Sequence, residues 1–240
     1  MNRAIRTVRN NEILYSAYRS ARDAYSYRAG QRRGSFSQHG EDHFILEHFM
    51  RKRSGFYVDV GASHPYRLSN TYLLYENGWR GVTVEPIPLL GRLHRKWRPE
   101  DILVPKAVGL AAGCLEFKEM LPSVLSTLDT ETAQAYIADG KAQLLRTYNI
   151  DVITLSQLFR EYAGQQRVDF LSIDMEGLDA AIITSCDFNE VRPSVICIEA
   201  NEQIDRARML DYFETQKYNL LTELGCNLIV EDAGCARPGI

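Results

Sequence analysis

Two short apolar segments, residues 56–60 and 82–85, constrain the fold of this chain more than any other feature. Each ends at a glycine or a carboxylate, in Phe56-Tyr-Val-Asp-Val-Gly-Ala62 and Gly81-Val-Thr-Val-Glu-Pro86, and residues 68–77 between them have a helical pattern. Continuous β-branched runs separated by a crossover helix are typical of buried parallel strands. Glu85 ends the second strand, where such a βαβ unit places a carboxylate that binds ribose hydroxyls. The pair therefore predicts a site for a nucleoside-containing cofactor.

The turn after the first strand, Asp59-Val-Gly-Ala-Ser-His-Pro65, narrows the choice of cofactor. Gly61 lets the backbone turn sharply and approach a ligand closely. No G-x-G-x-x-G pattern follows the strand, so the backbone cradle for a pyrophosphate is missing. A short turn with one glycine suits a cofactor that has a ribose and no diphosphate, as S-adenosylmethionine does.

The remaining apolar runs predict an alternation of strands and helices. Strands are expected at residues 102–108, 168–173 and 195–198, with a late pair at 218–222 and 226–230. Residues 115–120 are expected to form a hairpin with what precedes them, because residues 109–113 resemble a turn. Helices are expected over residues 89–97, 155–162, 180–183 and 206–215, and Ser37 is the expected N-cap of a further helix. This order predicts a doubly wound α/β sheet that ends in a hairpin.

Charge divides the chain into a basic N-terminal extension, residues 1–34, and a domain over residues 35–240. The extension carries eight arginines against two acidic residues, a net charge of +6, which leaves −9 of the total −3 for the rest. Apolar residues recur in it at helical spacing. It is either a solvated helix or a contact with a partner subunit or an anionic membrane surface. Within the domain, residues 121–150 read as a helical or mobile insertion that covers the acceptor pocket.

Composition excludes several classes of protein. The net charge of −3 gives no general case for a nucleic-acid partner. The five cysteines show no CxxC pair or zinc spacing, which indicates a reducing compartment. No apolar run approaches the roughly 20 residues of a membrane span, and the N-terminus lacks a signal-peptide core. These features predict a cytoplasmic protein. They do not decide between a monomer and a homo-oligomer.

The whole stretch from Asp59 to Pro86 resembles the FkbM family of S-adenosylmethionine-dependent methyltransferases. Three other segments are similar to that family: Ser37-Gln-His-Gly-Glu-Asp42, Lys106-Ala-Val-Gly109 and Phe170-Leu-Ser-Ile-Asp-Met-Glu-Gly177. The resemblance implies a class I (Rossmann-like) methyltransferase fold, with a mostly parallel seven-stranded sheet and a C-terminal antiparallel hairpin. It also implies O-methylation of a hydroxyl on a sugar, glycan or related natural product.

The resemblance assigns cofactor contacts by position. Glu85 would bind the ribose hydroxyls, and Ala107 and Val108 would flank the adenine. Asp174 would lie beside the transferring methyl group. The methionine and ribose portion would lie against the first turn, along Asp59, Gly61, Ala62 and Ser63.

Polar residues at two later strand ends form a second group, Asp174, Glu176, Glu199 and Asn201. Neighbouring parallel strands bring their carboxyl ends together, so these side chains are expected to converge. Asp174, Glu199 and Asn201 could hold Mg²⁺, which prefers oxygen ligands and would activate a substrate hydroxyl. Alternatively, the carboxylates bind the substrate or act as its base without a metal, or they are structural.

Histidine is the other source of a general base, because its ordinary pKa is close to neutral pH. His64 follows the cofactor turn directly and joins Asp174 and Glu199 as a catalytic candidate. His39 and His43 are four residues apart, but no third metal ligand is evident. His48 and His94 are expected to be solvated.

The leading hypothesis is therefore an O-methyltransferase with a small-molecule or glycan acceptor. A nucleotide- or nicotinamide-dependent α/β enzyme is the first alternative, against which the missing glycine fingerprint argues. A non-catalytic scaffold that keeps the methyltransferase fold is the second.

Overall fold

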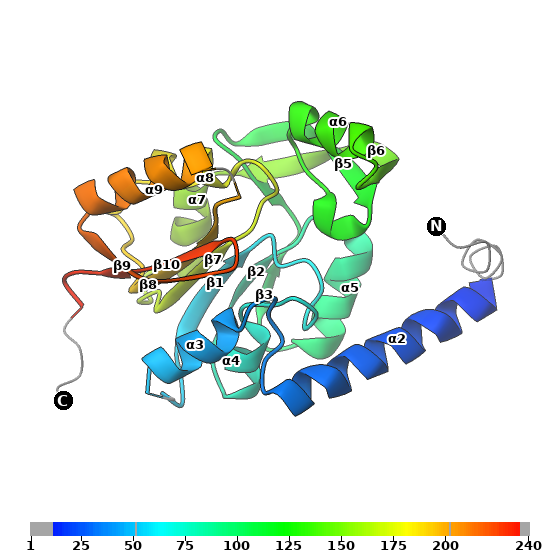
Figure 1. The fold of residues 1–240 in the computed structure, drawn as a ribbon, viewed down its shortest axis with the longest axis horizontal. Helices are drawn as coiled ribbons and strands as arrows, with labels where there is room; N and C mark the ends of the chain where they lie inside the picture. Colours follow the sequence, from blue (N-terminus) through cyan, green and yellow to red (C-terminus); the bar gives the residue numbers. More distant parts are fainter. Residues whose placement is uncertain (1–11, 51, 202, 236–240) are drawn as a thin grey trace.

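The computed structural model describes residues 12–50, 52–201 and 203–235. A central seven-stranded sheet has helices on both faces, and a second, three-stranded sheet packs at one end of it (Figure 1). Side chains that alternate along the central strands bury both faces. Val58, Leu171 and Ile196 face the cluster that includes the later helices, whereas Tyr57 and Phe170 pack with the earlier ones. Burial on both sides explains why these strands are continuously apolar.

The central sheet has the order β3-β2-β1-β7-β8-β10-β9. Its strands are β1 (Phe56–Val60), β2 (Arg80–Val84), β3 (Ile102–Val104), β7 (Phe170–Ile173), β8 (Val195–Glu199), β9 (Tyr218–Leu224) and β10 (Asn227–Asp232). The first five in spatial order are parallel, and β10 runs antiparallel to both of its neighbours. This topology confirms the predicted class I methyltransferase fold with its C-terminal antiparallel hairpin.

The strand order reverses at β1, whose neighbours are β2 and β7. Val60 pairs with Val84 on one side and with Ile173 on the other, so the carboxyl ends of the three strands are level. Open α/β sheets bind their ligands in the crevice at such a switch point. The fold therefore puts the binding crevice where β1, β2 and β7 end.

In the described part of the chain, helical segments precede or connect these strands, apart from two that accompany the second sheet. They are α2 (Glu12–Arg33), α3 (Glu41–His48), α4 (Tyr72–Glu76), α5 (Pro88–Trp97), α7 (Leu155–Leu158) continued by η2 (Phe159–Ala163), α8 (Asp179–Ser185) and α9 (Gln203–Thr215). Among the described residues, no helix is both long enough and apolar enough to cross a bilayer. Residues 1–11 of the predicted N-terminal extension lie outside the described residues.

Two helix starts differ from the sequence prediction. The helix expected over residues 68–77 is only the short α4, because the Ser69 hydroxyl accepts the backbone N–H groups of Thr71 and Tyr72 and forms a turn instead. Helix α3 begins after Gly40, which is its N-cap and has a φ of 90°. Ser37 is therefore not the N-cap. The Ser37 hydroxyl instead donates to the Asp42 carboxylate, which binds the loop ahead of the helix.

The second sheet corrects the prediction for residues 102–153. The expected third strand breaks at Pro105, which has no N–H to donate, so β3 stays in the central sheet while β4 (Ala107–Val108) joins the second. Strand β5 (Gly113–Leu121) pairs with β6 (Gln143–Ile153), not with the segment before it. Between them lie η1 (Ser123–Leu125) and α6 (Thr130–Ala138). Residues 143–150 of the predicted insertion therefore belong to a strand, whereas α6 forms the helical part.

Candidate active site

Three adjoining cavities open at the carboxyl ends of the central strands. The first cavity, about 550 Å³ including its mouth, lies between the end of β2 and the second sheet. The second, about 930 Å³, lies beside the ends of β1, β7 and β8. The third, about 880 Å³, continues between α6 and α9.

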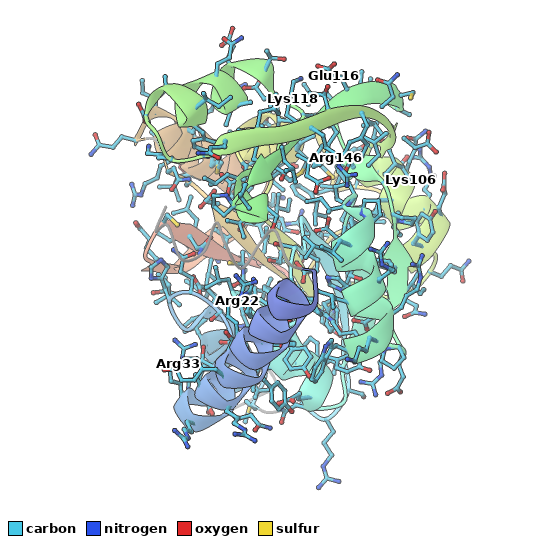
Figure 2. All side chains as sticks on the ribbon, turned by 90° about the vertical axis from the view of Figure 1, so that its right-hand side faces the viewer. Arg22, Arg33, Lys106, Glu116, Lys118 and Arg146 are labelled. Carbon is cyan, nitrogen blue, oxygen red and sulfur yellow. The ribbon has the colours of Figure 1, made fainter. Side chains whose placement is uncertain are left out.

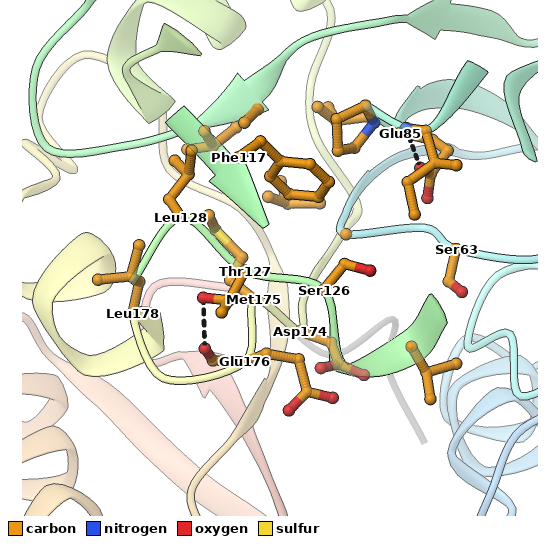
Figure 3. A pocket seen from close by; sticks show the side chains of 18 of the residues that line it. Ser63, Glu85, Phe117, Ser126, Thr127, Leu128, Asp174, Met175, Glu176 and Leu178 are labelled. Carbon is orange, nitrogen blue, oxygen red and sulfur yellow. Dashed lines mark hydrogen bonds between the residues drawn. The ribbon is translucent and has the colours of Figure 1, made fainter. Parts of the chain in front are cut away.

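Apolar side chains form much of the wall of the first cavity, with Glu85 at one end and Asp174 and Glu176 at the other (Figure 3). Ala107 and Val108 lie on one side, and Phe117 comes from β5. Glu85 is 4% exposed and accepts the backbone N–H of Ile87. Burial raises the pKa of Glu85 to about 8, although N–H groups of Ile87 and Ser63 oppose the rise. Apolar walls around a carboxylate with spare lone pairs fit a nucleoside, whose ribose offers two hydroxyl donors.

The turn after β1 separates the first cavity from the second. Gly61 has a φ of 78° and Ser63 a φ of 48°, and both border the two cavities. The Ala62 N–H donates to the Val84 carbonyl oxygen at 3.1 Å, which joins the turn to β2. His94 Nε2 donates to the Ser63 carbonyl oxygen at 2.9 Å. The turn is therefore held from both sides.

Asp59 lines the second cavity, and its carboxylate interacts with two other side chains. The Thr71 hydroxyl donates to it, and Arg98 Nη1 lies 3.7 Å from it. Burial raises the pKa of Asp59, and the Arg98 charge opposes the rise. Asp59 thus connects the end of β1 to Thr71 and Arg98. Its expected contact with a cofactor remains a proposal.

Three carboxylates meet at the second cavity, Asp174 and Glu176 after β7 and Glu199 at the end of β8. One oxygen from each lies within 4.8 Å of the others. Asp174 borders the first cavity as well as the second, so it faces both spaces. Asn201 also lines the second cavity. The structure therefore brings together the four side chains expected at the two strand ends, Glu176 among them.

Burial raises the pKa values of Asp174 and Glu176 in this cluster, and repulsion from the neighbouring carboxylates adds to the rise. Asp174 is accessible from the cavities, yet protein atoms displace much of its water, and that desolvation, with repulsion from Glu199, raises its pKa well above the ordinary range. Burial raises the pKa of Glu176 to about 7, against the opposing hydrogen bond from Tyr136. Burial likewise raises the pKa of the neighbouring Asp179 to about 7. The cluster therefore holds protons near neutral pH and can exchange them there.

A roof over the cavities comes from residues 123–136, between β5 and β6. The Tyr136 hydroxyl donates to the Glu176 carboxylate, and the Thr127 hydroxyl donates to the Glu176 carbonyl oxygen at 3.0 Å (Figure 3 shows the second bond). Sequence reasoning expected this segment to cover the acceptor pocket but named none of its residues. It also missed the cavity-lining residues Lys106, Phe117, Leu128, Met175 and Leu178. Phe117, the one aromatic residue of the segment 115–120, was the local signal for this part of the wall.

The histidine predictions require correction. His64 is buried with its ring against Tyr66, and its Nδ1 accepts the Arg67 N–H at 3.3 Å. Its Nε2 lies 3.7 Å from Asp23 of α2. It is not among the residues that line the three cavities, so the structure does not bring it to Asp174.

Two other histidines were expected to be solvated, and that expectation was wrong. His94 is 1% exposed, and burial lowers its pKa to about 3. His48 lies 3.0 Å from the Glu231 carboxylate. His39 and His43 border a shallow surface cavity, and within the described part of the chain neither joins a cluster of three metal-ligating side chains.

Comparison with known proteins gives one family match. The family described as Methyltransferase FkbM domain matches residues 59–220, which is more than half of the chain. No curated protein matches. The match covers the first two strand ends, the roof and the carboxylate cluster.

Three solved structures are similar at low identity. A TehB-like SAM-dependent methyltransferase from Corynebacterium glutamicum is 15% identical, with a TM-score of 0.41, covering 90% of this chain and 97% of that one. Precorrin-6y C5,15-methyltransferase from Geobacter metallireducens is 13% identical, with a TM-score of 0.37 and coverages of 79% and 84%. The 1,6-didemethyltoxoflavin-N1-methyltransferase from Burkholderia thailandensis is 11% identical, with a TM-score of 0.40 and coverages of 95% and 87%.

Proposed function

Because the chain belongs to the FkbM family of S-adenosylmethionine-dependent methyltransferases, we propose that its acceptor is a hydroxyl of a sugar, glycan or related natural product. The observation that carries the proposal is the position of Asp174, which borders both the first and the second cavity. A methyl donor in the first and an acceptor in the second would meet at this side chain.

The first cavity is the proposed place of the cofactor. Glu85 accepts the two ribose hydroxyls, and Ala107 and Val108 lie against the adenine with Phe117 opposite. Gly61, Ala62 and Ser63 lead the methionine portion toward Asp174. When bound, S-adenosylmethionine supplies a methyl group on a positively charged sulfur. The ionised members of the carboxylate cluster favour that charge by attraction.

The second cavity is the proposed place of the acceptor. Its wall carries hydroxyl and amide side chains, Ser69, Asn70, Tyr136 and Asn201, beside the carboxylates. Such a wall offers both donors and acceptors, which a polyhydroxylated molecule can satisfy together. It contains no lysine or arginine among the described residues that line it, so a phosphate or carboxylate on the acceptor would be disfavoured there.

Methyl transfer requires the acceptor oxygen to lose its proton as the new C–O bond forms. Asp174 or Glu199 would accept a hydrogen bond from that hydroxyl and then take its proton. A carboxylate with a raised pKa is the stronger base, and the cluster supplies one at this position. Alignment of the hydroxyl toward the methyl group contributes the rest of the rate.

A divalent cation is a second candidate for activating the hydroxyl, and the clustering of Asp174, Glu176 and Glu199 within 4.8 Å favours it. Oxygen ligands of this kind suit Mg²⁺, which would be held by these carboxylates with Asn201 nearby. The cation would lower the pKa of a hydroxyl bound to it.

The test is transfer of a radiolabelled methyl group from S-adenosylmethionine to a panel of sugars, glycans and polyketide-type alcohols. We expect label on an oxygen of at least one member, located by NMR, and micromolar binding of S-adenosylhomocysteine in calorimetry. Label found only on nitrogen or carbon acceptors would contradict the O-methylation proposal. Tighter binding of NAD than of S-adenosylhomocysteine would restore the nicotinamide alternative.

A further inference from the structure

The basic N-terminal segment is not used by the proposed reaction, and helix α2 shows how it is placed. Tyr27 packs its ring against Tyr66 and Trp97, at centroid distances of 5.5 Å in both cases. Gly30 is buried and leaves no room for a β-carbon against the Phe36 ring. Asp23 lies 3.7 Å from His64. These contacts fix which side of α2 faces the domain.

The opposite side of α2 is basic and carries an exposed aromatic ring. Asp23, Tyr27 and Gly30 follow the i, i+4, i+7 spacing of one helix face. At 100° per residue, Tyr25, Arg28 and Arg32 fall on the other face. Tyr25 is 75% exposed, and both arginines are exposed. Among residues 22–33 the only acidic residue is Asp23, which points into the domain.

Helix α5 extends this basic face. Its buried side consists of Leu90, Gly91 and His94. Its outer side carries the exposed cations Arg92, Arg95 and Lys96 together with Leu89, which is 36% exposed, and the helix contains no acidic residue. The two helices are neighbours through the Tyr27–Trp97 contact, and Figure 2 shows them side by side on one face of the molecule. We call the exposed residues Tyr25, Arg28, Arg32, Leu89, Arg92, Arg95 and Lys96 the α2–α5 face.

We propose that the α2–α5 face binds an anionic lipid surface. The face supplies five cations from two helices, and Lys and Arg near a membrane are attracted by the negative headgroups. Tyr25 and Leu89 lie among these cations, and exposed aromatic and aliphatic side chains can enter the interface between headgroups and acyl chains.

A flat anionic surface fits this protein better than a nucleic acid does. Residues 35–240 carry −9 overall although they include α5, so the domain is acidic on balance while five cations gather on one side, the α2–α5 face. A membrane touches that side alone, and salt screens the acidic remainder beyond about 8–10 Å. Two adjacent convex helices offer a flat contact, whereas sequence-tolerant nucleic-acid binding uses a grooved surface with aromatic platforms.

The experiment is sedimentation of the purified full-length chain with vesicles. Vesicles of phosphatidylcholine with about 30% phosphatidylglycerol are compared with phosphatidylcholine alone, at low and at high salt. We expect binding only to the anionic vesicles, and its loss as the salt rises. The variant Arg28→Gln/Arg32→Gln/Arg95→Gln should weaken binding about tenfold or more. Tyr25→Ser should weaken it a few-fold, because its ring contributes apolar contact.

A matched control removes the same charge elsewhere. Arg53, Arg160 and Arg208 are exposed and lie outside α2 and α5, so Arg53→Gln/Arg160→Gln/Arg208→Gln should bind vesicles like the wild type. Circular dichroism and thermal melting show whether each variant is folded. Equal loss in both triple variants, or equal binding to neutral vesicles, would overturn the proposal. So would tighter binding to a single-stranded RNA oligonucleotide than to the anionic vesicles.

Discussion

A β-carbon on Gly61 would lie 1.8 Å from the carbonyl oxygen of Asp174, so the turn after β1 and the end of β7 are in direct backbone contact. The Asp174 N–H also donates to the Val60 carbonyl oxygen at 3.1 Å. Two segments more than a hundred residues apart thus meet where the first and second cavities join. The position of the Asp174 carboxylate depends on this contact.

Replacement of Gly61 is the first test of that dependence. Gly61→Ala should lower the free energy of unfolding by about 3 kcal/mol or more, since the new methyl group meets a backbone oxygen and the φ of 78° disfavours alanine. Urea unfolding measures the loss. The matched control is Gly113→Ala, where no atom lies within 4 Å of the new carbon. Equal stability of the two variants would contradict the backbone contact.

Glu85 should make cofactor binding depend on pH. Its pKa in the free protein is about 8, and ribose hydroxyls that donate to the carboxylate favour its ionised form. The affinity for S-adenosylhomocysteine should therefore rise from pH 6 to about pH 8 and level off above that. Isothermal titration calorimetry at several pH values measures it. In Glu85→Gln the affinity for S-adenosylhomocysteine should be lower and should not rise with pH. If the affinity of this variant still rose with pH, a group other than Glu85 would be responsible.

The same carboxylate should reduce stability as the pH rises. The pKa of Glu85 in the folded protein, about 8, exceeds the ordinary value of 4.5. Its contribution to the free energy of unfolding is therefore fully present below pH 4.5 and is lost as the pH rises to about 8. Glu85→Gln, which keeps the acceptor oxygen for Ile87, should raise the free energy of unfolding by about 3 kcal/mol at pH 8 and little at pH 4.5. Denaturant unfolding at both pH values checks this, with the surface variant Glu214→Gln as control. If Glu85→Gln were less stable than the wild type at pH 8, the buried charge of Glu85 would not destabilise the folded protein, and the prediction would be wrong.

Tyr136 should connect the roof to the carboxylate cluster. Tyr136→Phe removes the hydrogen bond that lowers the pKa of Glu176, so that pKa should rise above about 7. The free energy of unfolding should fall by about 1–2 kcal/mol, as for a lost hydrogen bond to a charged group. NMR titration of the Glu176 carboxyl carbon measures the first change and urea unfolding the second. The exposed Tyr25→Phe serves as control, and an unchanged Glu176 titration would refute the connection.

Asp174→Asn should separate catalysis from binding. The amide keeps the shape of the side chain but cannot take a proton, so methyl transfer should fall about 100-fold or more. S-adenosylhomocysteine should bind within a few-fold of wild type, and the exposed Asp187→Asn should change neither property. Assays in EDTA then distinguish the two ways of activating the hydroxyl. Full activity of the wild type in EDTA supports a carboxylate base, and activity restored only by Mg²⁺ supports the cation.

The central sheet could be predicted because its signals are local. Strands β1, β2, β7 and β8 appear in the sequence as continuous apolar runs, because both of their faces are buried and polar residues do not alternate with apolar ones. Glu85 and Asp174 could be predicted as cavity residues for the same reason, because each directly follows such a run. The second sheet could not be predicted in this way. Strand β6 is mostly exposed, and its pairing with β5 depends on a contact across the intervening roof.

The sequence alone determined the fold class and the strand ends that carry polar groups, because strand burial and the residue after each strand are properties of short segments. Tertiary structure decided which of those groups meet. It brought Asp174, Glu176 and Glu199 within 4.8 Å of one another, and it turned His64 toward α2 and away from the cavities. It also put Tyr136 on the cluster from a segment that has no local signal for the site. Side-chain convergence depends on packing between distant segments, and no short pattern encodes that.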